Sequence, residues 1–235
     1  MDSLLKLQEV EAFIEKYHIL HEVSISVPKG GVTVLLGRNG AGKTTTLRTI
    51  MGLNQVNKGS VTFKGEEIRN LPPHHIAGKG IGYVPEDQGI FGELTVGENI
   101  RVAMKKENQE TTKRMEWVLE LFPDLKKFWK KPGGQLSGGQ KQMLSIARAY
   151  LNENELLLID EPSKGLAPIV VEKVTETIEQ MKEEATILLV EQNFAMANKV
   201  GDQFYIIDDG QTVHSGRMEE LQEDKAVMKK YLGIS

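Results

Sequence analysis

The sequence predicts an α/β protein with a parallel-sheet core into which a helical segment is inserted. Short apolar runs, typical of strands covered on both faces, occur at Val32 to Leu36, Leu156 to Asp160 and Thr186 to Glu191. Between the last two runs, Val170 to Lys182 has the apolar spacing of a helix. From about Thr95 to Gln135 the pattern is also helical. This order of elements is typical of a parallel sheet that carries an inserted lobe.

The N-terminal third contains further strands and one helix. Val23 to Val27 alternates apolar and polar side chains, as a half-buried strand does, and the turn sequence Pro28 to Gly31 ends it. Thr44 to Leu53 has helical spacing. Val61 to Phe63 and Ile81 to Val84 are predicted as short strands.

The inserted lobe is predicted to contain two helices. Thr111 to Phe122 has apolar residues at three- and four-residue intervals and stops before Pro123. A second helix is expected from Ser137 through Leu151. We therefore expect residues from about 95 to 135 to form the first part of the lobe, which continues to about residue 151.

The C-terminal part is predicted as a hairpin followed by a helix. Phe204 to Asp208 and Gln211 to His214 flank an Asp-Gly turn suited to positive φ. Met218 to Leu232 is expected to be one terminal helix. No repeat and no low-complexity linker is visible, so residues 1–235 are expected to form a single domain.

Composition excludes several kinds of protein. The chain has 235 residues, of which 40% are hydrophobic and 26% charged, as in a globular protein with an apolar core. It has no cysteine, which excludes a disulfide framework, a thiolate metal site and a cysteine nucleophile. Apolar runs such as Leu156 to Ile159 are far shorter than the ~20 residues of a membrane-spanning helix. Met1 to Leu5 lacks the pattern of a secretory signal, so a soluble cytoplasmic protein is expected.

Charge is unevenly distributed along the chain. The net charge is −4, which argues against a nucleic-acid partner. Arg101 to Lys131 contains nine basic and five acidic residues, a local balance of +4. This segment is either a solvated helical face or a surface that meets a partner or phospholipid headgroups.

A glycine-rich segment between a predicted strand and a predicted helix matches the phosphate-loop pattern G-x-x-x-x-G-K-[ST]. The backbone N–H groups of such a loop converge on phosphate oxygens, and the helix N-terminus favours an anion. Lys43 is expected to reach the β- and γ-phosphates of ATP, and Thr44 to bind Mg²⁺. The alternative is a glycine-rich turn with an incidental lysine. The predicted phosphate-binding residues are Gly37, Arg38, Asn39, Gly40, Ala41, Gly42, Lys43, Thr44 and the following Thr45.

Two adjacent carboxylates end a later buried strand. Asp160 and Glu161 follow four apolar residues, and such a strand delivers its acids to the carboxyl edge of the sheet, where phosphates bind. Asp160 is expected to hold Mg²⁺, and Glu161 to act as the general base on the water that attacks the γ-phosphate. Many strands end in acids, so this interpretation depends on the phosphate loop upstream.

A Ser-Gly-Gly-Gln segment opens the last lobe helix. Ser137 is a good N-cap, and Gly138 and Gly139 leave backbone N–H groups open to an anion before Gln140. Together with the phosphate loop and the Asp-Glu pair, this segment resembles the ATP-binding cassette (ABC) ATPases from about Leu5 to Gly233. The resemblance implies a parallel-sheet core with an antiparallel β portion and a helical lobe. It also implies a dimer that sandwiches two ATP molecules, in which the Ser-Gly-Gly-Gln segment of one subunit contacts ATP held by the other.

Three positions depart from the common family pattern. Glu86 stands where a glutamine senses Mg²⁺ and water, Gln192 where a histidine steadies the γ-phosphate, and Ala167 where an aspartate crosses the dimer interface. Glu86 can still bind the metal, and Gln192 can still donate a hydrogen bond to phosphate. With their neighbours, these residues resemble the second ATPase subunit of branched-chain amino acid importers. Lys164 replaces an apolar residue common in that subfamily.

The adenine contact is less clearly marked. The register of the resemblance places Ile14 where the family stacks an aromatic ring on the base. Phe13 or Tyr17 is expected to stack instead, and an apolar strand position is an equal alternative for either.

The resemblance also implies partners. Expected are integral-membrane permease subunits, a second ATPase subunit (a related chain or a second copy) and, indirectly, a substrate-binding protein. The chain would then lie peripherally on the inner face of the membrane, with Phe91, Leu94 and Thr95 near the permease. Alternatives are an ATPase for urea or amides, a non-transport nucleotide switch, or an ATP-binding subunit without catalysis.

Overall fold

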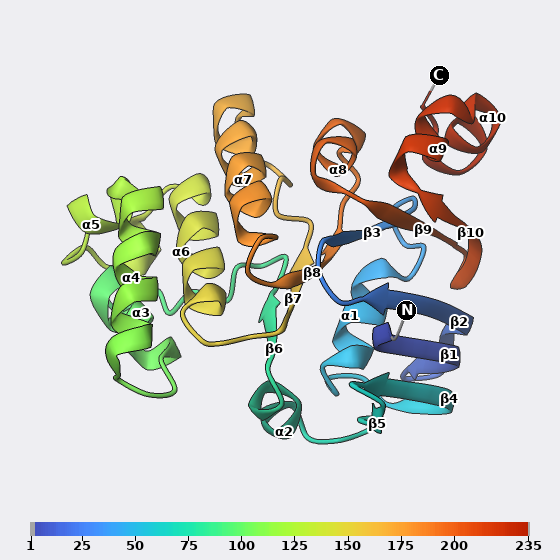
Figure 1. The fold of residues 1–235 in the computed structure, drawn as a ribbon, viewed down its shortest axis with the longest axis horizontal. Helices are drawn as coiled ribbons and strands as arrows, with labels where there is room; N and C mark the ends of the chain where they lie inside the picture. The colour runs from blue at the N-terminus through green and yellow to red at the C-terminus, as the bar shows by residue number, and fades with distance from the viewer. Residues whose placement is uncertain (1–2, 235) are drawn as a thin grey trace.

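The structure is a computed structural model that describes residues 3–234. The expectations that concern Met1, Asp2 and Ser235 therefore lie outside the described residues. A six-stranded sheet forms the centre of the fold (Figure 1). Its strands, in spatial order, are β10 (Gln211–Arg217), β9 (Gln203–Asp208), β3 (Val32–Leu36), β8 (Thr186–Val190), β7 (Leu156–Asp160) and β6 (Ile81–Val84). All neighbouring pairs are parallel except β9 and β10, which form the predicted hairpin.

A second, antiparallel sheet of four strands packs beside the first. Its order is β2 (Tyr17–Pro28), β1 (Ser3–Ile14), β4 (Val56–Phe63) and β5 (Glu66–Glu67). The predicted strand Val23 to Val27 is the second half of β2. The residue pattern did not locate β1, because bulges shift its register and Glu9 has a positive φ of 49°, so its apolar and polar residues do not alternate regularly.

The helices fall into two groups. Around the sheets lie α1 (Lys43–Ile50), α2 (Pro73–Gly78), α7 (Pro168–Met181) and α8 (Phe194–Val200). Between β6 and β7 the chain forms α3 (Val96–Ala103), α4 (Gln109–Leu121), α5 (Pro123–Lys127), a 3-10 turn (Gly133–Gln135) and α6 (Gly138–Tyr150). These helices lie together at one end of the molecule in Figure 1. The helix expected to reach Leu53 ends at Ile50, because Gly52 adopts a left-handed φ of 68°.

The prediction of a single C-terminal helix is wrong. The chain forms α9 (Met218–Glu223), α10 (Lys225–Val227) and a short π-helix (Met228–Leu232). Asp224 separates the first two with φ −90° and ψ 76°, and its carboxylate accepts the backbone N–H of Val227 at 3.0 Å. An aspartate that caps a new helix therefore interrupts the apolar repeat.

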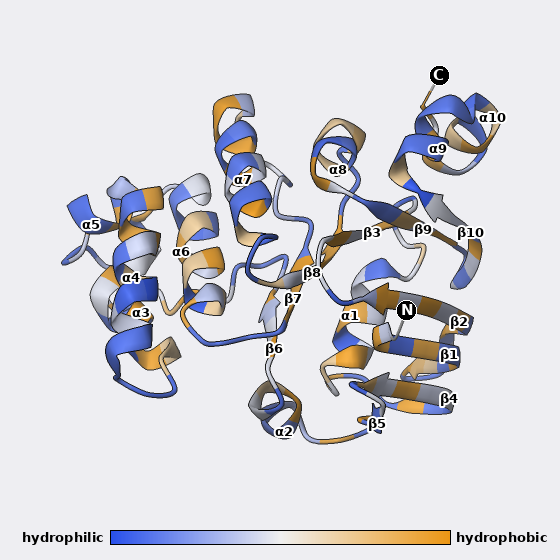
Figure 2. Cartoon of the chain, viewed as in Figure 1, coloured by the Kyte–Doolittle hydropathy of each residue, from blue (hydrophilic) through white to orange (hydrophobic). Residues whose placement is uncertain are grey.

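The core lies on both faces of the central sheet. On one face, Leu157 and Ile159 pack with residues of the inserted helices, such as Ile100 and Leu144. On the other face, Leu156 and its neighbours pack with the antiparallel sheet and α1. Figure 2 shows hydrophobic residues along the central strands and mixed hydrophobic and hydrophilic turns in the helices. Within residues 3–234, no helix is long and apolar enough to cross a membrane.

Candidate functional site

The phosphate loop connects β3 to α1, as predicted. Gly37 has φ 146°, and a Cβ there would lie 2.2 Å from the carbonyl oxygen of Ile207, so only glycine fits. Gly42 caps α1 in the left-handed conformation, without a capping side chain and without an acidic residue in the first turn. The first N–H groups of α1 are thus not capped by a side chain, as anion binding requires.

Lys43 is buried at the centre of this loop. Its Nζ donates to the carbonyl oxygens of Gly37 and Arg38, each at 3.0 Å, and lies 3.6 Å from Oε1 of Glu161. Burial lowers the pKa of Lys43, while the charges of Glu161 and Asp160 oppose that effect. The ammonium group therefore lies between the loop and the two predicted acids.

The other loop residues differ in their surroundings. Arg38, Asn39 and Gly40 are exposed, whereas Ala41 and Thr45 are buried. Arg38 donates from Nη2 to the carbonyl oxygen of Lys230, 3.4 Å away, so the C-terminal segment lies against the loop.

Thr44 and Asp160 meet, although 116 residues separate them. Thr44 donates from Oγ1 to Oδ1 of Asp160 at 3.1 Å, and the hydroxyl of Tyr83 lies 3.4 Å from Oδ2. Burial, assisted by the charges of Glu161 and Glu86, raises the pKa of Asp160 to about 6. A hydroxyl and a buried carboxylate at this separation are the oxygen ligands that Mg²⁺ prefers, so this pair fits the metal.

Glu161 is held by three side chains. It is 7% exposed and has a positive φ of 45°, a strained conformation for a non-glycine residue. Gln192 donates from Nε2 to Oε1 of Glu161, Lys43 approaches the same oxygen, and Lys164 lies 3.4 Å from Oε2. The structure thus brings the predicted base and the predicted histidine substitute into direct contact.

Glu86 lies at the edge of this group. Its carboxylate pairs with Nζ of Lys164, and no hydrogen bond joins it to Thr44 or Asp160 among the described residues. Among the described residues, Glu86 thus shares no hydrogen bond with the other two predicted metal ligands, although its charge acts on Asp160. Ala167 is exposed and is the N-cap residue of α7, without a capping side chain.

Glu191 is a site-supporting residue that the sequence pattern did not reveal. It is 1% exposed and accepts the backbone N–H groups of Ser163, Gln192 and Asn193 at 3.0, 2.9 and 2.9 Å. Burial raises its pKa. Its carboxylate therefore ties the segment that carries Gln192 to the segment that follows Glu161. A carboxylate at the end of an apolar strand was the only available signal.

The Ser-Gly-Gly-Gln segment forms the start of α6. Ser137 and Gln140 form a capping box, in which Ser137 Oγ accepts the N–H of Gln140 at 3.3 Å and Gln140 Oε1 accepts that of Ser137 at 3.1 Å. Gly138 is exposed, and Gly139 packs against Val170 of α7. Within residues 3–234, no hydrogen bond links this segment to the phosphate loop.

The predicted adenine residues lie in the β1–β2 hairpin. Phe13 stacks on His18, with ring centroids 4.2 Å apart, and Tyr17 is 60% exposed. The hairpin reaches the phosphate loop through Gly210, which accepts the N–H of His21 at 2.7 Å and donates to Ala41 at 2.9 Å. Both aromatic rings thus belong to a strand pair that borders the loop.

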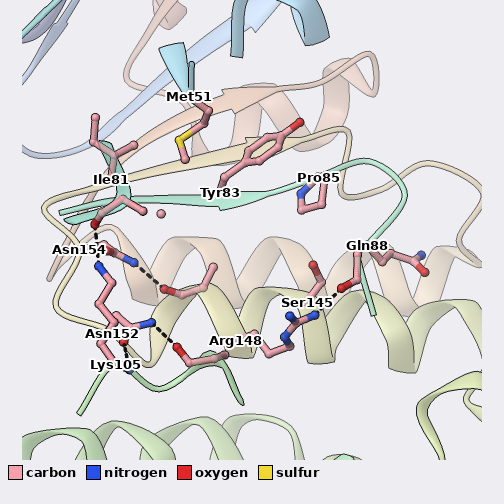
Figure 3. Close-up of a pocket in the computed structure, with 15 residues that line it drawn as sticks. Met51, Ile81, Tyr83, Pro85, Gln88, Lys105, Ser145, Arg148, Asn152 and Asn154 are labelled. Carbon is pink, nitrogen blue, oxygen red and sulfur yellow. Dashed lines mark hydrogen bonds between the residues drawn. The ribbon is translucent and has the colours of Figure 1, made fainter. Parts of the chain in front are cut away.

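A groove of about 350 Å³ is lined by residues of β6 and of α6, at the margin between the central sheet and the inserted helices (Figure 3). It is lined by Tyr83 and Pro85 on one side and by Arg148 of α6 on the other. The Arg148 guanidinium donates to the carbonyl oxygen of Gly89 and lies 5.0 Å from the ring centroid of Phe91. Burial lowers the pKa of Arg148. This groove adjoins the segment that carries Glu86.

Comparisons with known proteins agree with this geometry. The family described as ABC transporter matches residues 20–164. The high-affinity branched-chain amino acid transport ATP-binding protein BraG of Pseudomonas aeruginosa is 40% identical over 98% of this chain and 100% of its own length. The probable branched-chain amino acid transport ATP-binding protein LivF of Archaeoglobus fulgidus is 36% identical over 98% of this chain and 99% of its own.

A solved structure supports the same family relationship. The crystal structure of a nucleotide-free ATP-binding cassette from an ABC transporter matches with a TM-score of 0.84 and 26% identity over all of both chains. The expected fold, a parallel-sheet core with an antiparallel β portion and a helical lobe, is therefore confirmed. The chain belongs to the ABC transporter family.

Proposed function

We propose that this chain hydrolyses ATP to drive an importer for branched-chain or other hydrophobic amino acids. The observation that carries the proposal is that Lys43 meets Glu161 and Thr44 meets Asp160 at one edge of the central sheet. The amino acid substrate is proposed from the likeness to BraG and LivF, whose names state branched-chain amino acid transport.

The nucleotide site is proposed to work as follows. Backbone N–H groups from Gly37 to Thr45 bind the phosphates, and Lys43 leaves its loop carbonyls to contact the β- and γ-phosphates. Thr44 and Asp160 hold Mg²⁺, with Glu86 as a further oxygen donor. When bound, Mg²⁺ neutralises the charge that develops on the phosphates.

Hydrolysis is proposed to depend on two side chains. Glu161 takes the proton from the attacking water, and Gln192 orients Glu161 and donates to the γ-phosphate. The Phe13 or Tyr17 ring stacks on adenine. Residues Ser137, Gly138, Gly139 and Gln140 contact ATP bound to a second ATPase subunit, either a related chain or a second copy.

The permease is proposed to dock in the groove that Figure 3 shows. The whole chain is proposed to be a single ABC ATPase domain with a helical lobe. Residues from about 95 to 135 form the first part of this lobe, which continues to about residue 151. The groove lies between that lobe and the segment bearing Glu86, so a permease segment bound there would contact both the lobe and that segment. This arrangement places the chain on the inner face of the membrane, where the +4 segment meets anionic headgroups. A substrate-binding protein acts only through the permease.

Reconstitution tests this proposal. The chain is incorporated into proteoliposomes with candidate permease subunits and a candidate second ATPase subunit, and ATP-dependent leucine uptake is measured. We expect uptake with the unaltered chain and none with Glu161→Gln. Uptake of urea or acetamide but not leucine would overturn the amino acid assignment. Stimulation of ATP hydrolysis by DNA or ribosomes alone would favour a non-transport switch.

Charge reversal tests the orientation on the membrane. Three exposed lobe lysines, Lys126, Lys127 and Lys130, are changed to glutamate, and three exposed lysines of the antiparallel-sheet region, Lys6, Lys29 and Lys58, serve as the matched control. We expect lower uptake only from the lobe variant, since its charge faces the headgroups. Equal uptake by both variants would contradict this orientation.

A further inference from the structure

Lys164 contacts two of the predicted site carboxylates at once. Its Nζ hydrogen bonds to Oε1 of Glu86 and lies 3.4 Å from Oε2 of Glu161. Lys43 approaches the other oxygen of Glu161 at 3.6 Å. Glu161 therefore lies between two lysines. Among the described residues, Lys164 is the one cation within ion-pair distance of Glu86.

The position of Glu86 creates an electrostatic problem. Asp160 and Glu161 already place two carboxylates at this edge of the sheet, and Glu86, which shares Lys164 with Glu161, adds a third. Bound ATP adds further negative charge, and like charges at such short range repel each other. A cation that pairs with Glu86 and Glu161 therefore offsets part of the negative charge at this site.

Lys164 supplies the compensating charge from an exposed loop. It is 55% exposed on its side chain, whereas Glu161 is 7% exposed, so the pair joins a solvated cation to a buried acid. A lysine ammonium is protonated at neutral pH, so Lys164 brings a positive charge to both carboxylates. Lys164 lies three residues after Glu161, on the turn that leaves β7.

We propose that Lys164 is a positioning residue that neutralises Glu86 and holds Glu86 and Glu161 at the nucleotide site. The inference rests on the proposed ATP hydrolysis and adds a role for a residue outside the recognised motifs. The Glu86–Lys164 pair then acts as a unit in this chain.

A double-mutant cycle tests whether the two residues act together. Lys164→Met, Glu86→Gln and the double variant are made in the full chain, and binding of a fluorescent ATP analogue with Mg²⁺ is measured alongside ATP hydrolysis. Lys164→Met is expected to weaken binding about 5-fold when Glu86 is present, and less than 2-fold when position 86 is glutamine. The coupling should shrink in 0.5 M salt, and Lys164→Arg should restore binding, because both follow from charge.

A control variant and a folding measurement make the outcomes decisive. Lys79→Met removes an ion pair with Glu66, away from the site, and should leave analogue binding unchanged. Thermal unfolding monitored by circular dichroism checks that every variant is folded. Additive effects of Lys164→Met and Glu86→Gln would overturn the proposal, as would tighter binding by Lys164→Met. Failure of the unaltered chain to bind the analogue would instead overturn the proposed ATPase function.

Discussion

Gln192 donates a hydrogen bond from Nε2 to Oε1 of Glu161, although 31 residues separate the two. The contact joins the end of β8 to the end of β7, which are adjacent parallel strands. Gln192 lacks the charge of a histidine, but its amide both fixes the carboxylate and keeps a second N–H free. The position where the family usually has histidine is thus linked directly to the proposed base.

Replacement of Gln192 should slow hydrolysis more than it weakens binding. Gln192→Ala removes a hydrogen bond to a charged group, and we expect kcat to fall about 10-fold or more. Gln192→His should recover part of that loss, because its imidazole can donate to the same oxygen. Steady-state hydrolysis and analogue binding measure the two effects. An unchanged kcat in Gln192→Ala would show that the contact has no part in catalysis.

Glu191 should contribute strongly to stability. Glu191→Ala leaves three backbone N–H groups without their acceptor, which should cost about 2–3 kcal/mol and lower Tm by roughly 5–10 °C. Glu191→Gln keeps one acceptor oxygen and should lose less. Thermal unfolding measures both, with Glu179→Ala, which breaks a surface pair with Lys199, as the control. Equal Tm values for Glu191→Ala and the control would contradict this account.

Asp160 should make the nucleotide-free protein less stable as pH rises. Its pKa is raised from 3.8 to about 6, so the folded protein binds more protons than the unfolded chain between these values. The stability that its neutral form contributes is present below about pH 4 and is lost as pH rises through about 6.

Substitution of Asp160 by a neutral side chain tests the direction of this pH dependence of stability. Asp160→Asn should unfold a few degrees higher than the unaltered chain at pH 7.5, and the difference should shrink towards pH 4. Thermal unfolding in EDTA, without nucleotide, measures it. A difference that does not change with pH would exclude ionisation of Asp160 as its cause.

Local patterns predicted the parts of the site that lie at strand ends. The phosphate loop follows β3 and the Asp-Glu pair ends β7, and both strands flank β8 and run parallel to it. Because the carboxyl ends of parallel strands meet at one edge, Thr44 and Asp160 were expected to be close, and they are hydrogen bonded. The roles of Glu161 and Gln192 remain predictions.

Long-range side-chain contacts could not be predicted in the same way. Lys164 and Glu86 are 78 residues apart, and the length and flexibility of both side chains leave their pairing open until the fold brings the two loops together. The same holds for Glu191, whose partners are backbone groups. The break at Asp224 was missed because a capping hydrogen bond competed with an apolar repeat.

The most direct measurement compares ATP hydrolysis and MgATP-analogue binding by the unaltered chain and by Glu161→Gln. Loss of the general base should reduce kcat at least about 100-fold. Binding should persist, because Lys43 and Thr44 remain, and both proteins are assayed at the same concentration with their second ATPase subunit. Equal hydrolysis by the two proteins would contradict the assignment of Glu161 as the base, and so would loss of binding in Glu161→Gln.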